Sequence, residues 1–228
     1  MNARLISRSL IALTVLASSV AMAESAKNSM AVGEINVLPR IDGASGASEG
    51  EWATILSSTL RMSQQKDLVA TVSLQTGLFT DTLVRSKTGT SDTSTAEAGI
   101  EVRVLVDGVE AAPGVVVFDR RTQTLMAKFG GVLNECRDLN DDGTITGNTE
   151  CSWSDEELQL VLDTMGARAF TFALNDVGVG DHVIEVQARI STYRSSQTGA
   201  SNAGASIGKG SLTLEEVRLV RTNQLIGM

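Results

Sequence analysis

The chain has 228 residues, of which 42% are hydrophobic and 20% charged, the ordinary composition of a folded protein with one large or two small domains. It carries 19 Lys and Arg against 27 Asp and Glu, a formal net charge of -8. This acidic balance argues against a nucleic-acid-binding protein, which needs a basic face.

The first 23 residues have the organisation of a cleaved export signal. Arg4 and Arg8 precede an apolar run over 10–20, and Ala21-Met22-Ala23 gives the small-x-small site that a signal peptidase accepts. The alternative is an uncleaved anchor, but the run is shorter than the roughly 20 apolar residues that a membrane span needs. We therefore expect a mature chain over 24–228, without a membrane span, that is secreted or periplasmic.

Cys136 and Cys151 are the only two cysteines, and both remain in the mature chain. An exported protein reaches a compartment that allows disulfides, so we expect these two to pair. Two buried free thiols are the alternative. A zinc site is disfavoured because the single histidine, His182, would leave the ligand set incomplete.

Alternating apolar and polar residues predict several strands. The alternation is clearest over 68–75 and 100–106, and Asp107-Gly108 after the second segment is a hairpin turn sequence. Further strands are expected over 115–118, 124–129, 169–174, 183–190 and 212–220. Three stretches rich in Gly, Ser, Thr and Ala are expected to be loops, namely 43–50, 86–98 and 195–210.

One segment has the spacing of a short amphipathic helix. Leu158, Val161, Leu162 and Met165 fall at i, i+3, i+4 and i+7, and Ser154 with Glu157 forms a capping box that opens a helix ending near 166. Many strands with one helix predict a mainly β fold. We expect a single antiparallel β-sandwich, of jelly-roll or immunoglobulin-like kind, with this helix in a connection.

We divide the chain into a signal peptide over 1–23, an N-terminal extended segment or arm over 24–50, and the β-sandwich over 51–228. The arm holds one alternating patch over 32–38. This patch is either a strand of the same fold or an arm that adds a strand to a neighbouring subunit, which would make a homo-oligomer.

The strongest local motif lies between the two cysteines, in an acidic loop that we expect the disulfide to close over 136–151. Asp138, Asn140 and Asp142 stand at positions 1, 3 and 5, followed by Gly143 at position 6. This pattern resembles the calcium loops of EF-hands and dockerin-type modules. The resemblance implies a structural calcium ion held by these three side chains, with the carbonyl of Thr144 at position 7.

Two features of the loop depart from that pattern. Position 12, where the family places a bidentate carboxylate, is Thr149, and Glu150 comes one residue later as the substitute ligand. No helix precedes Asp138. Acidic loops rich in Asn, Asp and Gly also form turns that hold no ion, so a solvated turn remains the alternative.

No catalytic constellation emerges from the sequence. His182 has no nucleophile motif beside it, and we assign no catalytic residue. Two hypotheses remain. The first is a non-catalytic structural or interaction protein with an extracellular protein partner. The second is a carbohydrate-active protein, either a calcium-dependent glycan-binding module or a hydrolase, for which Trp52, Trp153 and Tyr193 are the candidate stacking residues.

Overall fold

A computed structural model of the chain describes residues 28–42, 45–86, 90–145 and 149–219, and in these ranges the protein is mainly β, with no helix. The expected signal peptide over 1–23 lies outside the described residues. The strands, in chain order, are β1 (Asn28–Asp42), β2 (Gly46–Glu49), β3 (Ala53–Met62), β4 (Lys66–Ser86), β5 (Ser91–Val106), β6 (Val109–Glu110), β7 (Val116–Lys128), β8 (Val132–Cys136), β9 (Cys151–Ser154), β10 (Glu156–Val177), β11 (Gly180–Ser196) and β12 (Ala200–Val217).

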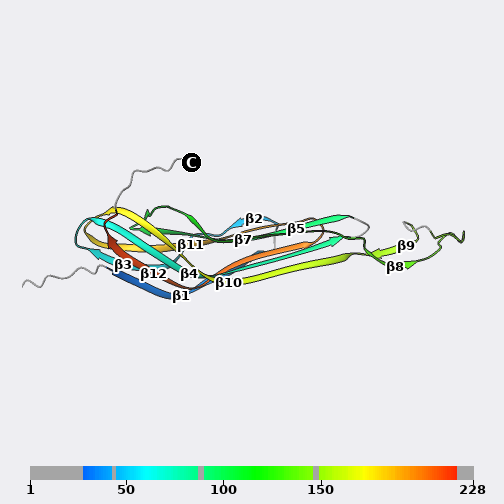
Figure 1. Cartoon of the computed structure of the whole chain (residues 1–228), viewed down its shortest axis with the longest axis horizontal. Coiled ribbons are helices and arrows are strands. Elements are labelled where there is room, and N and C mark those ends of the chain that lie inside the picture. The colour runs from blue at the N-terminus through cyan, green and yellow to red at the C-terminus, as the bar shows by residue number, and fades with distance from the viewer. Residues whose placement is uncertain (1–27, 43–44, 87–89, 146–148, 220–228) are drawn as a thin grey trace, which may run out of the picture.

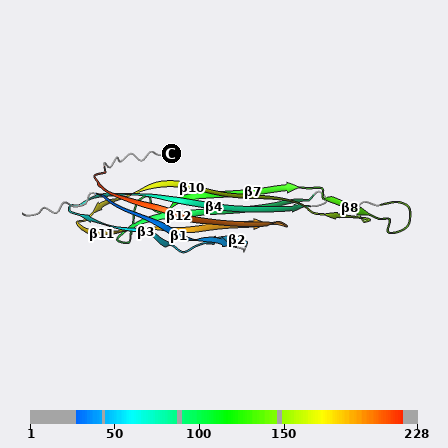
Figure 2. The same cartoon turned by 90° about the horizontal axis from the view of Figure 1, so that it is seen from below.

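The strands form three antiparallel sheets. One has the order β1-β12-β4-β10. The second is centred on β11 and β5, with β2 and β3 on the outer side of β11 and with β6 and β7 on the outer side of β5. The third is the short pair β8-β9. The two larger sheets run side by side along an elongated body, and β8 and β9 project from one end (Figure 1, and from below in Figure 2).

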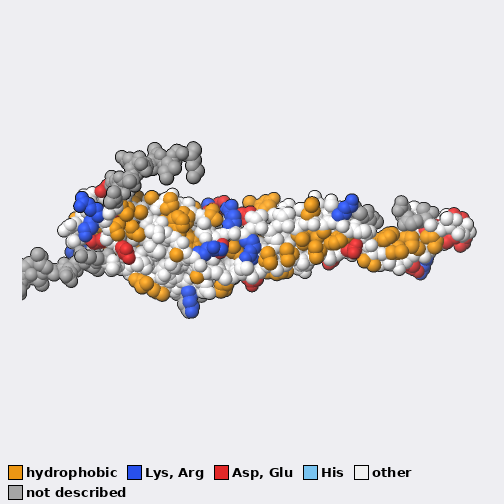
Figure 3. Space-filling model, in the orientation of Figure 1, with side chains coloured by type: hydrophobic (Ala, Val, Ile, Leu, Met, Phe, Trp, Pro, Cys, Tyr) orange, Lys and Arg blue, Asp and Glu red, His pale blue; other side chains and the backbone are white. Residues whose placement is uncertain are grey.

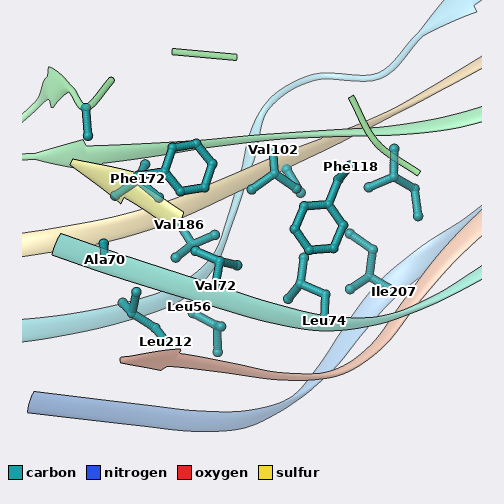
Figure 4. Close-up of a cluster of buried hydrophobic side chains, with 14 of the residues drawn as sticks. Leu56, Ala70, Val72, Leu74, Val102, Phe118, Phe172, Val186, Ile207 and Leu212 are labelled. Carbon is teal, nitrogen blue, oxygen red and sulfur yellow. The ribbon is translucent and has the colours of Figure 1, made fainter. Parts of the chain in front are cut away.

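Apolar side chains from both larger sheets meet in one core. Val72 and Leu74 of β4 lie with Val102 of β5 and Ile207 of β12 among its buried members. Figure 4 shows Leu74 of β4 and Phe118 of β7 pointing toward one another. Burial alternates along β4 and β5, as expected for strands with one face toward a core.

Where β7 lies against β4, the interior holds polar side chains in place of apolar ones. Buried Thr80 donates its hydroxyl to the Oε1 of Gln123 at 2.8 Å. The Nε2 of Gln123 in turn donates to the carbonyl of Leu160, 2.7 Å away on β10. Polar side chains therefore join β4, β7 and β10 here, and their buried groups have the partners that burial requires.

The expected helix over 154–166 is wrong, because Ser154 ends β9 and residues 156–166 form the first half of β10. Strand β10 pairs with β4 without interruption from Glu156 to Leu174. Leu158, Leu160 and Leu162 also alternate at the period of a strand, so the segment fits both patterns. The long ladder offered by β4 then overrides the local helical spacing.

The N-terminal segment completes its own sheet. The patch expected over 32–38 lies within β1, which pairs with β12 of the same chain from Asn28 to Asp42. Within the residues that the structure describes, no helix is long and apolar enough to cross a membrane.

Candidate functional site

The acidic loop lies at the tip of the projection formed by β8 and β9, which we call the finger (residues 132–154). Cys136 and Cys151 are partners in the register of this strand pair, and their sulfur atoms are 1.98 Å apart. The predicted disulfide is therefore confirmed. It joins the two strands where the loop begins and ends, so the loop has a fixed base.

Within the loop, the three side chains of the predicted pattern come together. The carboxylate of Asp138 accepts the backbone N–H groups of Asn140 at 3.2 Å, Asp142 at 3.3 Å and Gly143 at 2.7 Å. The Nδ2 of Asn140 donates to the carboxylate of Asp142 at 3.0 Å. A positive φ of 79° at Gly143 turns the chain, as a glycine readily allows.

The two remaining predicted ligands differ in environment. Thr144 donates its backbone N–H to Asp142 at 2.7 Å, which keeps it beside the cluster. Glu150 is buried at the base of the loop, where its Oε1 accepts the N–H of Leu139 at 3.1 Å. Residues 146–148 of the loop lie outside the described residues.

The donor set of the loop is made of oxygen atoms, which suits a hard cation such as calcium. In the described part of the chain, no group of three or more His, Cys, Asp and Glu side chains is arranged to hold a metal ion. An ion here would therefore take the carboxylates of Asp138 and Asp142 and complete its shell with amide, backbone and water oxygens. The calcium site stays a prediction.

His182 forms an ion pair near the start of β11. Its Nδ1 lies 2.6 Å from the carboxylate of Asp107, and its Nε2 lies 3.0 Å from the carbonyl of Gly178. The hydrogen bond to Asp107 raises the pKa of His182, and the same bond lowers the pKa of Asp107. Asp107 also accepts the N–H of Val183 at 2.8 Å, so the pair fixes the turn after β5 to the start of β11.

Two of the candidate glycan-stacking residues, Trp52 and Trp153, lie in different surroundings. The guanidinium carbons of Arg103 and Arg189 lie 4.4 Å and 4.9 Å from the ring centre of Trp52. These cation–π contacts occupy a ring that a sugar would need. Trp153 lies in β9 opposite Leu133, in the finger.

Strand β10 is the edge of its sheet, and most of its outer side is unpaired. At Ala173 the backbone turns outward and exchanges two hydrogen bonds, of 2.8 Å and 2.9 Å, with Ala112. The register with β4 is unbroken from Glu156 to Leu174, so every odd-numbered residue from 157 also directs its backbone outward. Among the described residues, no strand pairs with these groups between Glu157 and Thr171.

This open edge also carries exposed apolar side chains. Leu158, Leu160 and Leu162, on the face shared with buried Phe172, are between 39% and 44% exposed, and Val161 and Met165 project from the opposite face. Figure 3 shows hydrophobic side chains in a row along this part of the body and on toward β8 and β9. We call residues 157–171 the β10 edge.

The β10 edge was not predicted from the sequence, because residues 154–166 were assigned to a helix and a strand was expected only over 169–174. Alternating Leu158, Leu160 and Leu162 was the available indication of a strand. No protein-family model matches the chain, and a search of curated proteins finds no relative.

Proposed function

We propose that the protein is an exported, non-catalytic structural or interaction protein that binds its partner along the β10 edge. Its two larger sheets would make a single β-sandwich of jelly-roll or immunoglobulin-like kind, acting in the periplasm or outside the cell. The observation that carries the proposal is the backbone of β10 from Glu157 to Thr171, whose outer side has no strand partner in the described part of the chain.

Such an edge is suited to binding an added strand. Proteins that avoid edge pairing place charged residues, above all lysine, or proline or a bulge on the exposed strand. The β10 edge carries three charged residues, Glu157, Asp163 and Arg168, but it has no lysine and no proline, and its register shift comes only after Leu174. An extended segment laid beside it would gain backbone hydrogen bonds and cover the exposed leucines.

We propose in addition that the finger binds calcium. The adjacent side chains of Asp138, Asn140 and Asp142 support this, since carboxylate and amide oxygens are ligands that calcium prefers. Bound calcium would neutralise the two carboxylates and hold the loop in one conformation, giving the finger a fixed tip.

The carbohydrate-active alternative has weaker support. Trp52 is covered by Arg103 and Arg189, which leaves Tyr193 and Trp153 as exposed rings on different strands. A sugar platform needs aromatic faces that are open to the ligand.

The interaction function is tested by site-specific cross-linking in the cells that export the protein. A photo-reactive amino acid replaces Met165 on the β10 edge, and a matched variant carries it at Met126, an exposed residue of β7. We expect covalent adducts from position 165 and few from position 126. Equal labelling at both positions, or no adduct from 165, contradicts the proposed function whatever the partner is.

A further inference from the structure

We propose that the partner of the β10 edge is the β10 edge of a second copy, paired antiparallel about a two-fold axis at Thr164. The proposal rests on the interaction function above and names its partner.

The limits of the ladder fix the register. At one end the outward backbone of Ala173 is already bonded to Ala112, so an added strand reaches no further than Thr171. At the other end β10 begins at Glu156, and Glu157 is its first residue with an outward backbone. Thr164 is the midpoint of the span 157–171. An antiparallel pair of copies that uses the whole open edge of both therefore has its two-fold axis at Thr164.

The backbone groups match in this register. The outward residues are the eight odd-numbered positions from 157 to 171, and each faces another odd-numbered position of the second copy. Directly opposed residues of this type exchange both of their N–H···O bonds. Every open donor and acceptor on the β10 edge thereby gains a partner, over a length of about 50 Å at the usual rise per residue.

The side chains on the Phe172 face match in size. Leu158 comes opposite the second copy's Phe170, and Leu162 comes opposite Gly166. A Cβ built on Gly166 meets no atom within 4 Å, so the site opposite Leu162 is open. Leu160 comes opposite Arg168, whose guanidinium is paired with Asp119. Leu158 and Leu162 thus face an aromatic and a small residue of the second copy, which covers these two exposed leucines.

On the opposite face of the β10 edge, larger side chains also come opposite small ones. Val161 comes opposite Ala167, and Gln159 comes opposite Ala169. The charged residues of the β10 edge are Glu157, Asp163 and Arg168, and none of them falls directly opposite another charge. Like charges directly opposed would destabilise the pair, and this register avoids them.

A second copy fits better than an unrelated strand because its edge has the same length and the same unpaired groups. One contact satisfies both copies and closes on itself, since the two-fold axis leaves no β10 edge open for a third chain. The paired strands would join the two four-stranded sheets of the dimer into one continuous sheet.

The first test measures the mass of the purified protein in solution. The full-length chain is expressed for export, purified in its processed form without reductant, and followed by light scattering over a dilution series. We expect a dimer that dissociates on dilution. The double variant Val161→Lys with Met165→Lys should shift the mass to that of a monomer, because lysines on a paired edge oppose strand addition.

The control variant carries the same two charges on another edge. Val117→Lys with Met126→Lys alters β7 residues of 53% and 73% exposure, close to the 49% and 69% of Val161 and Met165. It should remain dimeric. Circular dichroism and a melting curve establish that both double variants are folded.

The second test locates the two-fold axis of the proposed dimer. Thr164 would face its own copy at a position of close Cα approach, within the range that a disulfide spans, so Thr164→Cys should cross-link two chains on mild oxidation. Gln159→Cys should not, because the two Gln159 residues lie at opposite ends of the pairing. The native cysteines are already bonded to one another and do not interfere.

The outcomes separate this proposal from the function on which it rests. A monomeric wild-type chain, a dimer that survives the β10 lysines, or equal cross-linking at positions 164 and 159 overturns the self-pairing. Adducts from position 165 with other proteins in the exporting cell would still support the interaction function. Absence of any adduct there, as set out above, contradicts that function as well.

Discussion

Arg168 of β10 and Asp119 of β7 form an ion pair in which Nη2 and Oδ1 are 2.9 Å apart, and the pair joins the edges of the two larger sheets. Asp119 is buried, and its other carboxylate oxygen accepts the hydroxyl of buried Thr76 of β4 at 2.7 Å. Three strands from two sheets therefore meet at one carboxylate. This contact ties the β10 edge to β7 in addition to its ladder with β4.

Replacing Asp119 should destabilise the fold. Asp119→Ala leaves the buried Thr76 hydroxyl with only the distant carbonyl of Gly166, 3.5 Å away, as an acceptor, and the free energy of unfolding should fall by about 1–3 kcal/mol. Urea unfolding followed by circular dichroism measures this loss. The control is Arg120→Ala, which removes an exposed neighbour paired with Glu97 and should change stability by less than about 0.5 kcal/mol. Equal losses for the two variants would contradict the role assigned to Asp119.

The ion pair between His182 and Asp107 should make stability depend on pH. Asp107 raises the pKa of folded His182 above the ordinary value of 6.5, so the folded state holds the proton more tightly than the unfolded chain. The stabilisation is therefore complete below pH 6.5 and is lost as the pH rises through the raised pKa. Urea unfolding over this range should show stability falling with pH, and His182→Ala should remove that slope. A slope that persists in the variant would assign it to another group.

Asp107 contributes at the acidic end of the pH range. Its lowered pKa means that its stabilisation is complete above the ordinary value of 3.8 and is lost as the pH falls through the lowered value. Asp107→Asn should therefore flatten the acid limb of the same stability curve. An unchanged acid limb would contradict this.

Calcium should raise the melting temperature of the non-reduced protein. A ligand at a hundredfold excess over its dissociation constant adds about 2.7 kcal/mol to the stability of the state that binds it. Asp138→Ala with Asp142→Ala should abolish the difference between calcium and chelator. Asp141→Asn is the matched control, because Asp141 stands between the predicted ligands at position 4 of the loop pattern. A calcium response that survives loss of both ligands would place the ion elsewhere.

Asp163 should oppose dimerisation. In the proposed register it faces Met165 of the second copy, which brings the two Asp163 carboxylates to diagonal positions across the axis. Such a like-charge neighbour costs roughly 0.2–1 kcal/mol, so Asp163→Asn should tighten the dimer by up to about fivefold. Light scattering over a dilution series at low salt measures the change. Weakened association in this variant would exclude an axis at Thr164.

The turn chemistry and the clearest strands could be predicted from the sequence. Asp107 and Gly108 both have positive φ, of 51° and 82°, in the two-residue connection between Val106 and Val109. Only a few residue types tolerate this backbone, so Asp-Gly after an alternating segment is a strong local indication. The disulfide was predictable as well, since two cysteines in a chain that is expected to be exported leave one pairing.

The small-residue stretches could not be assigned from local composition. Residues 91–98 and 200–210, expected to be loops, lie within β5 and β12. Ala96 and Ala98 of β5 and Ala203 of β12 are completely buried, because β5 and β12 contact each other across the interior. Small side chains there fill a narrow space between sheets, a requirement that appears only once both strands are placed.

The error at β10 has a similar origin. Leu158, Val161 and Leu162 have the spacing of a helix, whereas Leu158, Leu160 and Leu162 have the spacing of a strand, and the capping box at Ser154 favoured the helix. What decides the outcome is β4, a strand of 21 residues whose partner on that side must come from elsewhere in the chain. Nothing in the local sequence indicates long-range pairing of this kind. The open edge of β10 therefore could not be predicted either.

Residue-resolved hydrogen exchange on the β10 edge tests the central claim most directly. The amides of Leu160 and Leu162 face β4 and should be protected at every concentration, whereas those of Val161 and Met165 face outward. We predict that the outward amides exchange rapidly in dilute protein and become protected as the concentration rises. Outward amides that stay unprotected in the associated protein, or that are protected in the dilute monomer, would contradict an open edge that binds a second copy.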